Sequence, residues 1–223
     1  MRRFDAVLFD VDGTLYDNWR MYLRSIPFAL RHFRLMRAFS KVRREIRGIR
    51  PIENFYALQA ELLGEELDIP VAEARELIDR AIYQEWESKL EGITIDPEVR
   101  ELIDYLQGKS DLKTGVLSDF PLTRKLKRIG LDYPWDLVLS SEEVGYLKPN
   151  PEPFQEAASR LGVRPEAVLY VGNSYHYDVL GSKAVGMLCA HYAPKPRQNS
   201  EADLSFSAFG QLHRWIVQQQ EYT

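Results

Sequence analysis

The sequence predicts an α/β fold: a doubly wound parallel sheet with a block of helices inserted after the first strand. Short apolar runs recur along the chain with helical patterns between them, as expected for strands that are buried on both faces of a parallel sheet. One long interval contains helical patterns only. Alternation of strand and helix at this spacing forms a doubly wound sheet with right-handed crossovers.

The apolar runs place the expected strands. They are residues 6–10, 114–119, 136–141, 167–173 and 185–192, with a short edge strand at 203–206. The first five are rich in Val and Leu and lack the polar alternation of a strand with one face in water.

Capping residues mark two of the helices between these strands. Asp96 is the expected N-cap of one helix, with Pro97 at its first helical position. Asn150 and Pro151 repeat the pattern, and Gly162 stands where a C-terminal glycine is expected. The stretch "SFSAFGQLHRWIVQQQ" is typical of a final helix.

The interval from residue 16 to residue 92 shows no strand pattern. Ile26, Leu30, Phe33 and Met36 are spaced by three and four positions, which predicts a helix. We therefore expect an α/β core made of residues 1–15 and 93–223, interrupted by a small all-helical insert over residues 16–92.

Composition excludes several classes of protein. The apolar fraction of 45% and charged fraction of 28% are ordinary for a globular protein, and a net charge of −4 gives no argument for nucleic acid as a partner. The single cysteine, Cys189, permits no internal disulfide and lies in an apolar stretch, where a small buried side chain is expected. No stretch reaches the ~18 apolar residues of a membrane span. We expect a cytoplasmic protein with no membrane partner; its oligomeric state stays open.

Polar side chains gather at the carboxyl ends of the expected strands, where ligands bind in doubly wound sheets. They are Asp10, Asp12, Thr14, Ser118, Lys148, Asn173 and Asp178. Positions i and i+2 of an extended chain face the same way, so Asp10 and Asp12 can point into one cleft. An acidic set with one lysine suits Mg²⁺, which takes oxygen ligands and keeps some of its waters. A bound phosphate would supply further oxygens.

The order of these residues resembles a known family. "DVDGT", a serine ending the next strand, "KPNPEPF" and "VGNSYHYDVLGS" are similar to the four ordered motifs of haloacid dehalogenase-like hydrolases. The insert resembles the helical cap of one large branch of that superfamily. The resemblance covers nearly the whole chain and implies a Rossmann-like catalytic core with a cap domain.

The resemblance also implies roles for the site residues. Asp10 would be the nucleophile that forms an aspartyl-phosphate, and Asp12 would protonate the leaving alcohol and then deprotonate water. Thr14 and Ser118 would hydrogen-bond the transferring phosphoryl group, while Lys148 would offset negative charge.

The resemblance implies a metal site as well. Mg²⁺ would be held by Asp10, by the backbone carbonyl of Asp12, and by Asn173 and Asp178. The family usually has aspartate where this chain has Asn173, so we expect weaker metal binding or ligation that passes partly to Asp178. Asp119 stands where asparagine is usual; it either restores the lost charge or is satisfied by backbone amides away from the metal.

The first half of the insert is strongly basic. Its basic residues are Arg20, Arg24, Arg31, Arg34, Arg37, Lys41, Arg43, Arg44, Arg47 and Arg50. We favour a solvated helical face. The alternatives are an electropositive lid over phosphorylated substrates and a contact surface for membrane or nucleic acid.

The leading hypothesis is a Mg²⁺-dependent phosphatase, a phosphoric monoester hydrolase whose partner is a small phosphorylated metabolite. Dehalogenation is disfavoured, because the dehalogenase branch lacks the aspartate that Asp12 provides. One alternative is a weak or inactive phosphate-ligand-binding or regulatory protein on the same fold. Another is a phosphotransferase or mutase that uses the same nucleophile and keeps water out.

Overall fold

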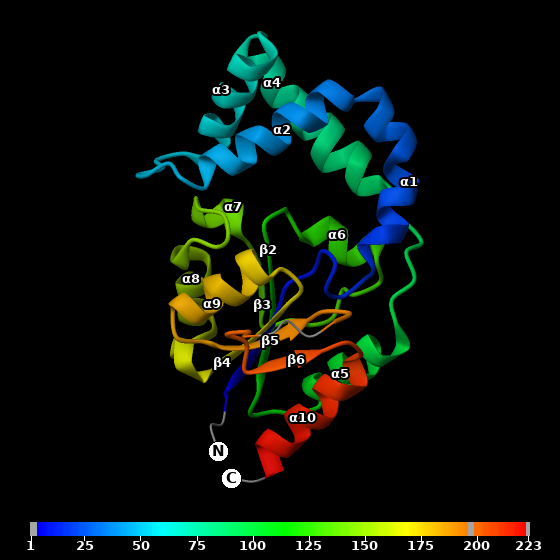
Figure 1. Ribbon diagram of the computed structural model, residues 1–223, viewed down its shortest axis with the longest axis vertical. Coiled ribbons are helices and arrows are strands. Elements are labelled where there is room, and N and C mark those ends of the chain that lie inside the picture. Colours follow the sequence, from blue (N-terminus) through cyan, green and yellow to red (C-terminus); the bar gives the residue numbers. More distant parts are fainter. Residues whose placement is uncertain (1–3, 196–198, 222–223) are drawn as a thin grey trace.

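The computed structural model describes residues 4–195 and 199–221, and an all-parallel sheet lies at its centre (Figure 1). Within these residues six strands form one sheet in the order β3-β2-β1-β4-β5-β6. The strands are β1 (Ala6–Phe9), β2 (Lys113–Ser118), β3 (Leu137–Ser140), β4 (Val168–Gly172), β5 (Leu188–Tyr192) and β6 (Leu204–Phe206). Every neighbouring pair is parallel. The predicted doubly wound sheet is confirmed.

The predicted strand bounds agree with the structure to within one residue at the start of every strand except β5. β5 starts at Leu188 instead of residue 185, because the preceding residues turn. Gly186 adopts a φ of 87°, a conformation that favours glycine, and its N–H donates to the carbonyl of Lys183. The turn ends the helix before the strand and fixes where β5 enters the sheet.

Helices cover both faces of the sheet (Figure 1). One face packs on α5 (Pro97–Gln107), α6 (Thr123–Arg128) and α10 (Phe209–Glu221). The other packs on α8 (Pro151–Leu161), with α7 (Ser141–Val144) and α9 (Leu180–Ala184) nearby. The short turns η2 (Pro165–Ala167) and η3 (Tyr175–Val179) flank β4. Val7 and Phe9 of β1 point to the first core, and Ala6 and Leu8 point to the second, as strand alternation requires.

The predicted helix starts are correct, although one cap differs. The carboxylate of Asp96 accepts from the N–H of Glu98, 2.8 Å away, at the start of α5. Asn150 precedes α8 but makes no side-chain cap bond. Its amide instead donates to the carbonyl oxygens of Arg47 and Leu147.

Helices between β1 and α5 form a second layer over the carboxyl ends of the strands (Figure 1). They are α1 (Asn18–Arg31), α2 (Phe33–Ile46), α3 (Phe55–Leu67), α4 (Val71–Leu77) and the π-helical η1 (Ile78–Trp86). They share an apolar core that includes Phe39, Ile46, Leu63 and Ile82. The described residues 18–92 contain no strand, as expected. The insert boundaries at residues 16 and 92 stay a prediction.

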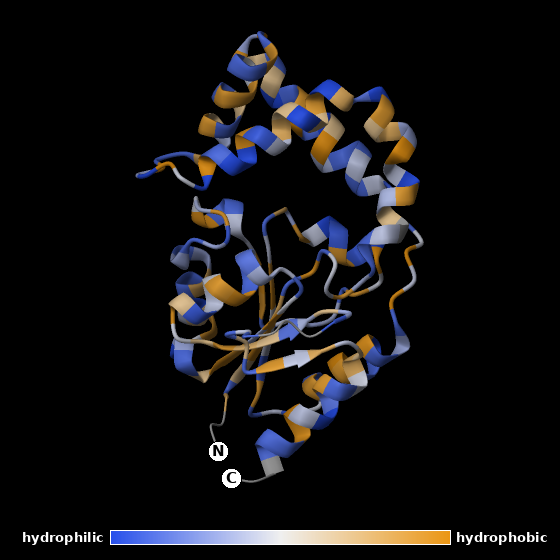
Figure 2. Ribbon diagram, in the orientation of Figure 1, coloured by the Kyte–Doolittle hydropathy of each residue, from blue (hydrophilic) through white to orange (hydrophobic). Residues whose placement is uncertain are grey.

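The apolar spacing over residues 26–36 indicated helix correctly, but the structure divides this stretch between α1 and α2, and the apolar positions do not form the buried face. Ile26, Leu30 and Phe33 are 49%, 75% and 63% exposed, and the chain bends at His32 between α1 and α2. Figure 2 shows orange and blue segments alternating along these helices. None of the described helices is long and apolar enough to cross a membrane.

Candidate active site

Segments that follow β1, β3 and β4 bring three of the predicted site residues together. The Nζ of Lys148 donates to an oxygen of Asp10 and to an oxygen of Asp178, at 2.7 Å in each case. All three side chains are buried. One ammonium group therefore holds two carboxylates from motifs far apart in the sequence.

The environment of Asp10 favours protonation in the absence of a further cation. Its second oxygen accepts from the hydroxyl of Thr14 at 2.8 Å. Burial raises the pKa of Asp10 to about 7, and the charges of Asp178 and Asp12 act in the same direction, against the lowering effect of Lys148. The site is thus short of positive charge around Asp10.

Asp12 lies in a different environment, two residues further along. Its oxygens accept from the Nζ of Lys125 at 2.7 and 2.9 Å, from the hydroxyl of Ser118 at 2.9 Å, and from the hydroxyl of Tyr16. Burial would raise the pKa of Asp12, but the Lys125 ammonium and these hydrogen bonds outweigh it and leave the pKa lowered. The ionised form of Asp12 is therefore the stable one here.

Sequence reasoning missed Lys125. The residue lies in α6 and is buried, although its neighbours Arg124 and Lys127 are exposed. A usable signal was its position: Leu122, Lys125, Leu126 and Ile129 form the buried face of the helix. A lysine within such an apolar stripe needs a buried anion, and Asp12 provides it.

Asp178 and Lys148 are further held by Tyr170, which sequence reasoning also missed. The Tyr170 hydroxyl lies 3.1 Å from the Nζ of Lys148 and donates to Asp178 at 3.1 Å. The other oxygen of Asp178 accepts from the N–H of Ser174 at 2.8 Å. Burial lowers the pKa of Lys148, but Asp10 and Asp178 outweigh this effect and raise the pKa well above its ordinary value. Lys148 is a fixed positive charge.

Asn173 lies against the loop that follows Asp12. Gly13 adopts a φ of 82°, and a Cβ on Gly13 would overlap the side-chain amide of Asn173. Glycine at position 13 thus allows both the turn and the close approach. The backbone carbonyl oxygen of Asn173 lies 3.1 Å from the Nε2 of His191.

The donor set and its charge fit a hard divalent cation, although the side chains do not form a ready-made metal cluster. Across the described residues, no group of three or more His, Cys, Asp or Glu side chains could hold a metal ion. Asp10 and Asp178 converge on Lys148, while Asp12 pairs with Lys125. Three carboxylates face two ammonium groups, which leaves one negative charge in excess. The carboxylate oxygens and the nearby Asn173 amide are ligands that suit Mg²⁺.

The carboxylate of Asp119 is held by other protein groups, which is the second of the two alternatives given for it above. One of its oxygens accepts from the backbone N–H of Lys148 at 3.0 Å, and the other accepts from Arg47 at 2.7 Å. Both oxygens are thus satisfied by a backbone amide and an arginine, and the carboxylate positions Lys148.

The basic segment of the insert is not simply a solvated face, and that interpretation is wrong for Arg43 and Arg47, whereas Arg50 is exposed. Arg43 is buried, pairs with the buried Glu142 and donates to the carbonyl of Asp119 at 2.6 Å. Arg47 donates to the carbonyl of Lys148 at 2.7 Å. Arg50 pairs with the carboxylate of Glu152. These arginines join the insert to the core.

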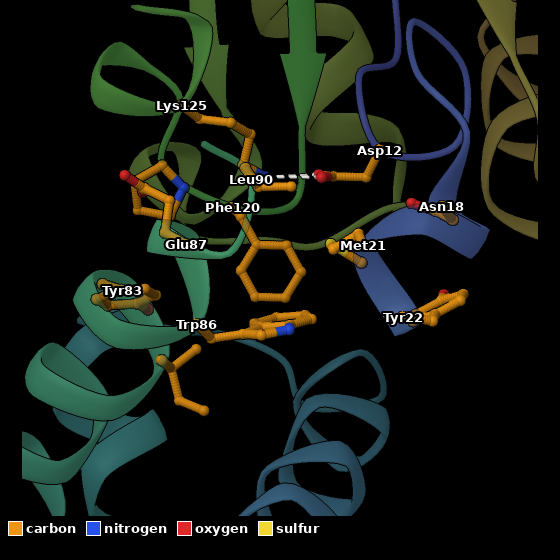
Figure 3. A pocket seen from close by; sticks show the side chains of 12 residues that line it. Asp12, Asn18, Met21, Tyr22, Tyr83, Trp86, Glu87, Leu90, Phe120 and Lys125 are labelled. Atoms are coloured by element: carbon orange, nitrogen blue, oxygen red, sulfur yellow. Dashed lines mark hydrogen bonds and ion pairs between the residues drawn. The ribbon is translucent and has the colours of Figure 1, made fainter. Parts of the chain in front are cut away.

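A cavity of about 130 Å³ adjoins Asp12 between the insert and the core (Figure 3). Phe120 and Lys125 line it from the core side, and Met21, Tyr22 and Trp86 line it from the insert. The carboxylate of Asp12 reaches one end of the cavity, where the dashed line in Figure 3 joins it to Lys125.

Comparison with known proteins gives consistent similarities. Residues 4–186 match the model of the family described as haloacid dehalogenase-like hydrolase. The chain is 29% identical over 197 residues to a glyceraldehyde 3-phosphate phosphatase of Methanopyrus kandleri, covering 82% of this chain and 81% of the relative. It is 30% identical over 199 residues to the pyrophosphatase PpaX of Bacillus velezensis, covering 86% and 84%.

Solved structures share the fold. A 2-haloacid dehalogenase from Pseudomonas syringae pv. tomato aligns with a TM-score of 0.70 at 23% identity, covering 96% of this chain and 99% of the other. A phosphatase of the same family from Thermococcus onnurineus aligns with a TM-score of 0.64 at 26% identity, covering 95% and 97%.

Proposed function

Because this chain belongs to the haloacid dehalogenase-like hydrolase family, we propose that it is a phosphatase that hydrolyses small phosphomonoesters through an aspartyl-phosphate on Asp10. The observation that supports this most is the pairing of Lys148 with Asp10 at 2.7 Å, with Asp12 two residues further on. Relatives named as phosphatases of small phosphorylated molecules support the same class of substrate.

In the first step, an oxygen of Asp10 attacks phosphorus and the P–O bond to the alcohol breaks. Lys148 offsets the charge of Asp10 and of the incoming phosphoryl oxygens, and the hydroxyls of Thr14 and Ser118 donate hydrogen bonds to that group. Phosphoryl transfer depends mainly on such positioning and charge neutralisation, so these few groups suffice.

Asp12 moves the protons. An incoming phosphate dianion raises the pKa of the adjacent Asp12 carboxyl and favours the protonated form, which gives its proton to the leaving alcohol. Once the alcohol has left, Asp12 is ionised, and Lys125 and Tyr16 stabilise that form. It then takes a proton from the water that hydrolyses the aspartyl-phosphate.

The proposed cofactor is Mg²⁺, held by Asp10, the backbone carbonyl of Asp12, Asp178 and the amide oxygen of Asn173. When bound, it supplies positive charge that orients the phosphate and offsets the excess negative charge of the carboxylates. We assign residues 16–92 to a cap that covers the carboxyl ends of the strands and contacts the alcohol part of the substrate.

The test is hydrolysis of p-nitrophenyl phosphate in the presence of Mg²⁺ by the wild type, Asp10→Asn and Asp5→Asn. Asp5 is an exposed aspartate beside the other end of β1, so its variant is a matched control. We expect Asp10→Asn to lose at least about 1,000-fold in kcat and Asp5→Asn to lose less than about twofold. Activity that survives Asp10→Asn refutes the assigned nucleophile.

A further inference from the structure

We propose that the cavity beside Asp12 binds the alcohol part of the substrate and selects phosphomonoesters whose alcohol carries an aromatic ring. The inference rests on the proposed phosphatase function, because it uses Asp12 as the group that protonates the leaving oxygen. It adds a chemical class of substrate, because none of the relatives is named for an aromatic phosphomonoester.

The position of the cavity sets the orientation of the substrate. Asp12 lines it, whereas Asp10 and Lys148 do not. Asp12, the proposed proton donor for the leaving oxygen, therefore lies at the end of the cavity nearest Asp10 and Lys148, where the phosphate is expected. A substrate whose leaving oxygen lies at Asp12 extends its alcohol carbon atoms into the cavity, away from Lys148.

Aromatic side chains dominate the lining. The rings of Trp86 and Phe120 lie 5.6 Å apart with an interplanar angle of 80°, an edge-to-face pair (Figure 3). Met21 and Leu90 add apolar surface, and Tyr22 lies at the margin. A third ring entering between such surfaces can stack on one face and meet the edge of another, as aromatic groups prefer.

The charges around the cavity disfavour an anionic alcohol. Lys125 is the cation among the described lining residues, and its Nζ already donates to both oxygens of Asp12. Glu87 also lines the cavity, and its buried carboxylate faces Arg128 at 3.3 Å and Arg124 at 3.7 Å. The cations at the cavity are thus paired with Asp12 and Glu87, so a substrate carboxylate or second phosphate placed here would be desolvated with no free cation among these lining residues.

The size of the cavity limits the group to about one ring. Its volume is about 130 Å³. An apolar cavity of about 150 Å³ in another protein accommodates benzene, so a single six-membered ring is the appropriate occupant.

The first experiment compares two substrates that leave a similar primary alcohol. Benzyl phosphate carries a ring, and phosphoglycolate carries a carboxylate, in each case on the carbon that bears the phosphate. We expect kcat/KM in the presence of Mg²⁺ to be at least about tenfold higher for benzyl phosphate, since the ring gains apolar and aromatic contacts. An equal or higher kcat/KM for phosphoglycolate overturns the proposal.

Two pairs of variants place the effect in the cavity. Tyr22 and Leu23 are neighbours on α1 with similar exposures of 58% and 55%, but only Tyr22 lines the cavity. We expect Tyr22→Ala to lower kcat/KM for benzyl phosphate at least threefold while leaving phosphoglycolate within about twofold. Leu23→Ala should change neither. Trp86→Phe, which keeps a ring, should retain more of the preference than Trp86→Ala. Equal effects of Tyr22→Ala and Leu23→Ala would contradict the assignment.

A binding measurement separates this proposal from the proposed activity. Benzylphosphonate resembles phenyl phosphate but has no bond that the enzyme can hydrolyse, and phosphonoacetate presents a carboxylate in place of the ring. Calorimetry with Mg²⁺ present should give at least about tenfold tighter binding of benzylphosphonate, lost in part in Tyr22→Ala. Such binding without turnover of any phosphomonoester refutes the phosphatase and retains the aromatic site. Turnover with tighter binding of phosphonoacetate refutes the aromatic site alone.

Discussion

The ammonium group of Lys148 lies 2.7 Å from a carboxylate oxygen of Asp10, although the two residues are 138 positions apart in the sequence. The parallel sheet makes this possible, because β1, β2 and β3 end at the same edge; Asp10 follows β1, and Lys148 follows β3 and α7. The pairing gives Asp10 a fixed counter-charge, and the rest of the proposed mechanism follows from it.

Lys125→Met should impair catalysis more than folding. The variant removes the ammonium that donates to both oxygens of Asp12, so we expect kcat to fall about 10- to 100-fold. The pKa of Asp12 should rise, because Lys125 is the main group that lowers it against burial. The alkaline limb of the pH profile of kcat/KM, along which Asp12 loses the proton that it gives to the alcohol, should therefore move to higher pH. Lys127→Met, on the exposed side of the same helix, is the control; a profile unmoved by Lys125→Met would contradict this role for the lysine.

Arg43→Ala should strongly destabilise the protein. Arg43 and Glu142 form a buried ion pair between the insert and the core, and their side chains are 6% and 0% exposed. Removing one partner leaves an unpaired buried charge, which costs about 3–5 kcal/mol. Urea unfolding should show this loss, whereas Arg44→Ala, an exposed neighbour, should change the free energy of unfolding by less than about 0.5 kcal/mol. Similar midpoints for both variants would refute the structural role of this pair.

Asn173→Asp should bind Mg²⁺ more tightly. The substitution adds a carboxylate beside Gly13, in the loop that follows Asp12, and metal affinity rises with the number of charged ligands. We expect the Mg²⁺ concentration for half-maximal activity to fall several-fold. Asn54→Asp adds the same charge at the start of α3 and should leave that concentration unchanged. If the two variants have the same metal requirement as the wild type, Asn173 is not a ligand.

Cys189 should be unreactive in the folded protein. It is a buried free thiol in β5, and burial raises its pKa to about 12, so little thiolate is present at neutral pH. A thiol reagent followed by mass spectrometry should label the chain only after unfolding in guanidinium chloride. Rapid stoichiometric labelling under native conditions would show that β5 opens or that the thiol is exposed.

The sequence predicted the parts of the site that lie in local motifs at strand ends. Asp10, Lys148 and Asp178 could be assigned to one cleft because the topology of a parallel sheet determines where strand ends meet. Charge partners on separate elements could not be assigned in this way. In the sequence, Arg43 cannot be distinguished from the solvated arginines around it. Its partner Glu142 is 99 positions away in the chain, and only the folded structure brings the two together.

The spacing of apolar residues predicts helices but does not predict which side of a helix is buried. The spacing of Ile26, Leu30 and Phe33 indicates a helix but does not state which face the rest of the molecule covers. The exposure of this stripe follows from how α1 packs, through Met21 and Phe28, onto its neighbours. Tertiary contacts determine which face of the helix is buried, and these contacts cannot be derived from a single sequence.

The most direct test of the central claim is detection of the phosphorylated residue itself. The enzyme is quenched in acid during turnover of p-nitrophenyl phosphate and then treated with borohydride, which reduces an aspartyl-phosphate to homoserine. Peptide mass spectrometry should find homoserine at position 10, and no such change in Asp10→Asn or without substrate. Turnover that leaves position 10 unmodified while another aspartate is reduced would contradict Asp10 as the nucleophile.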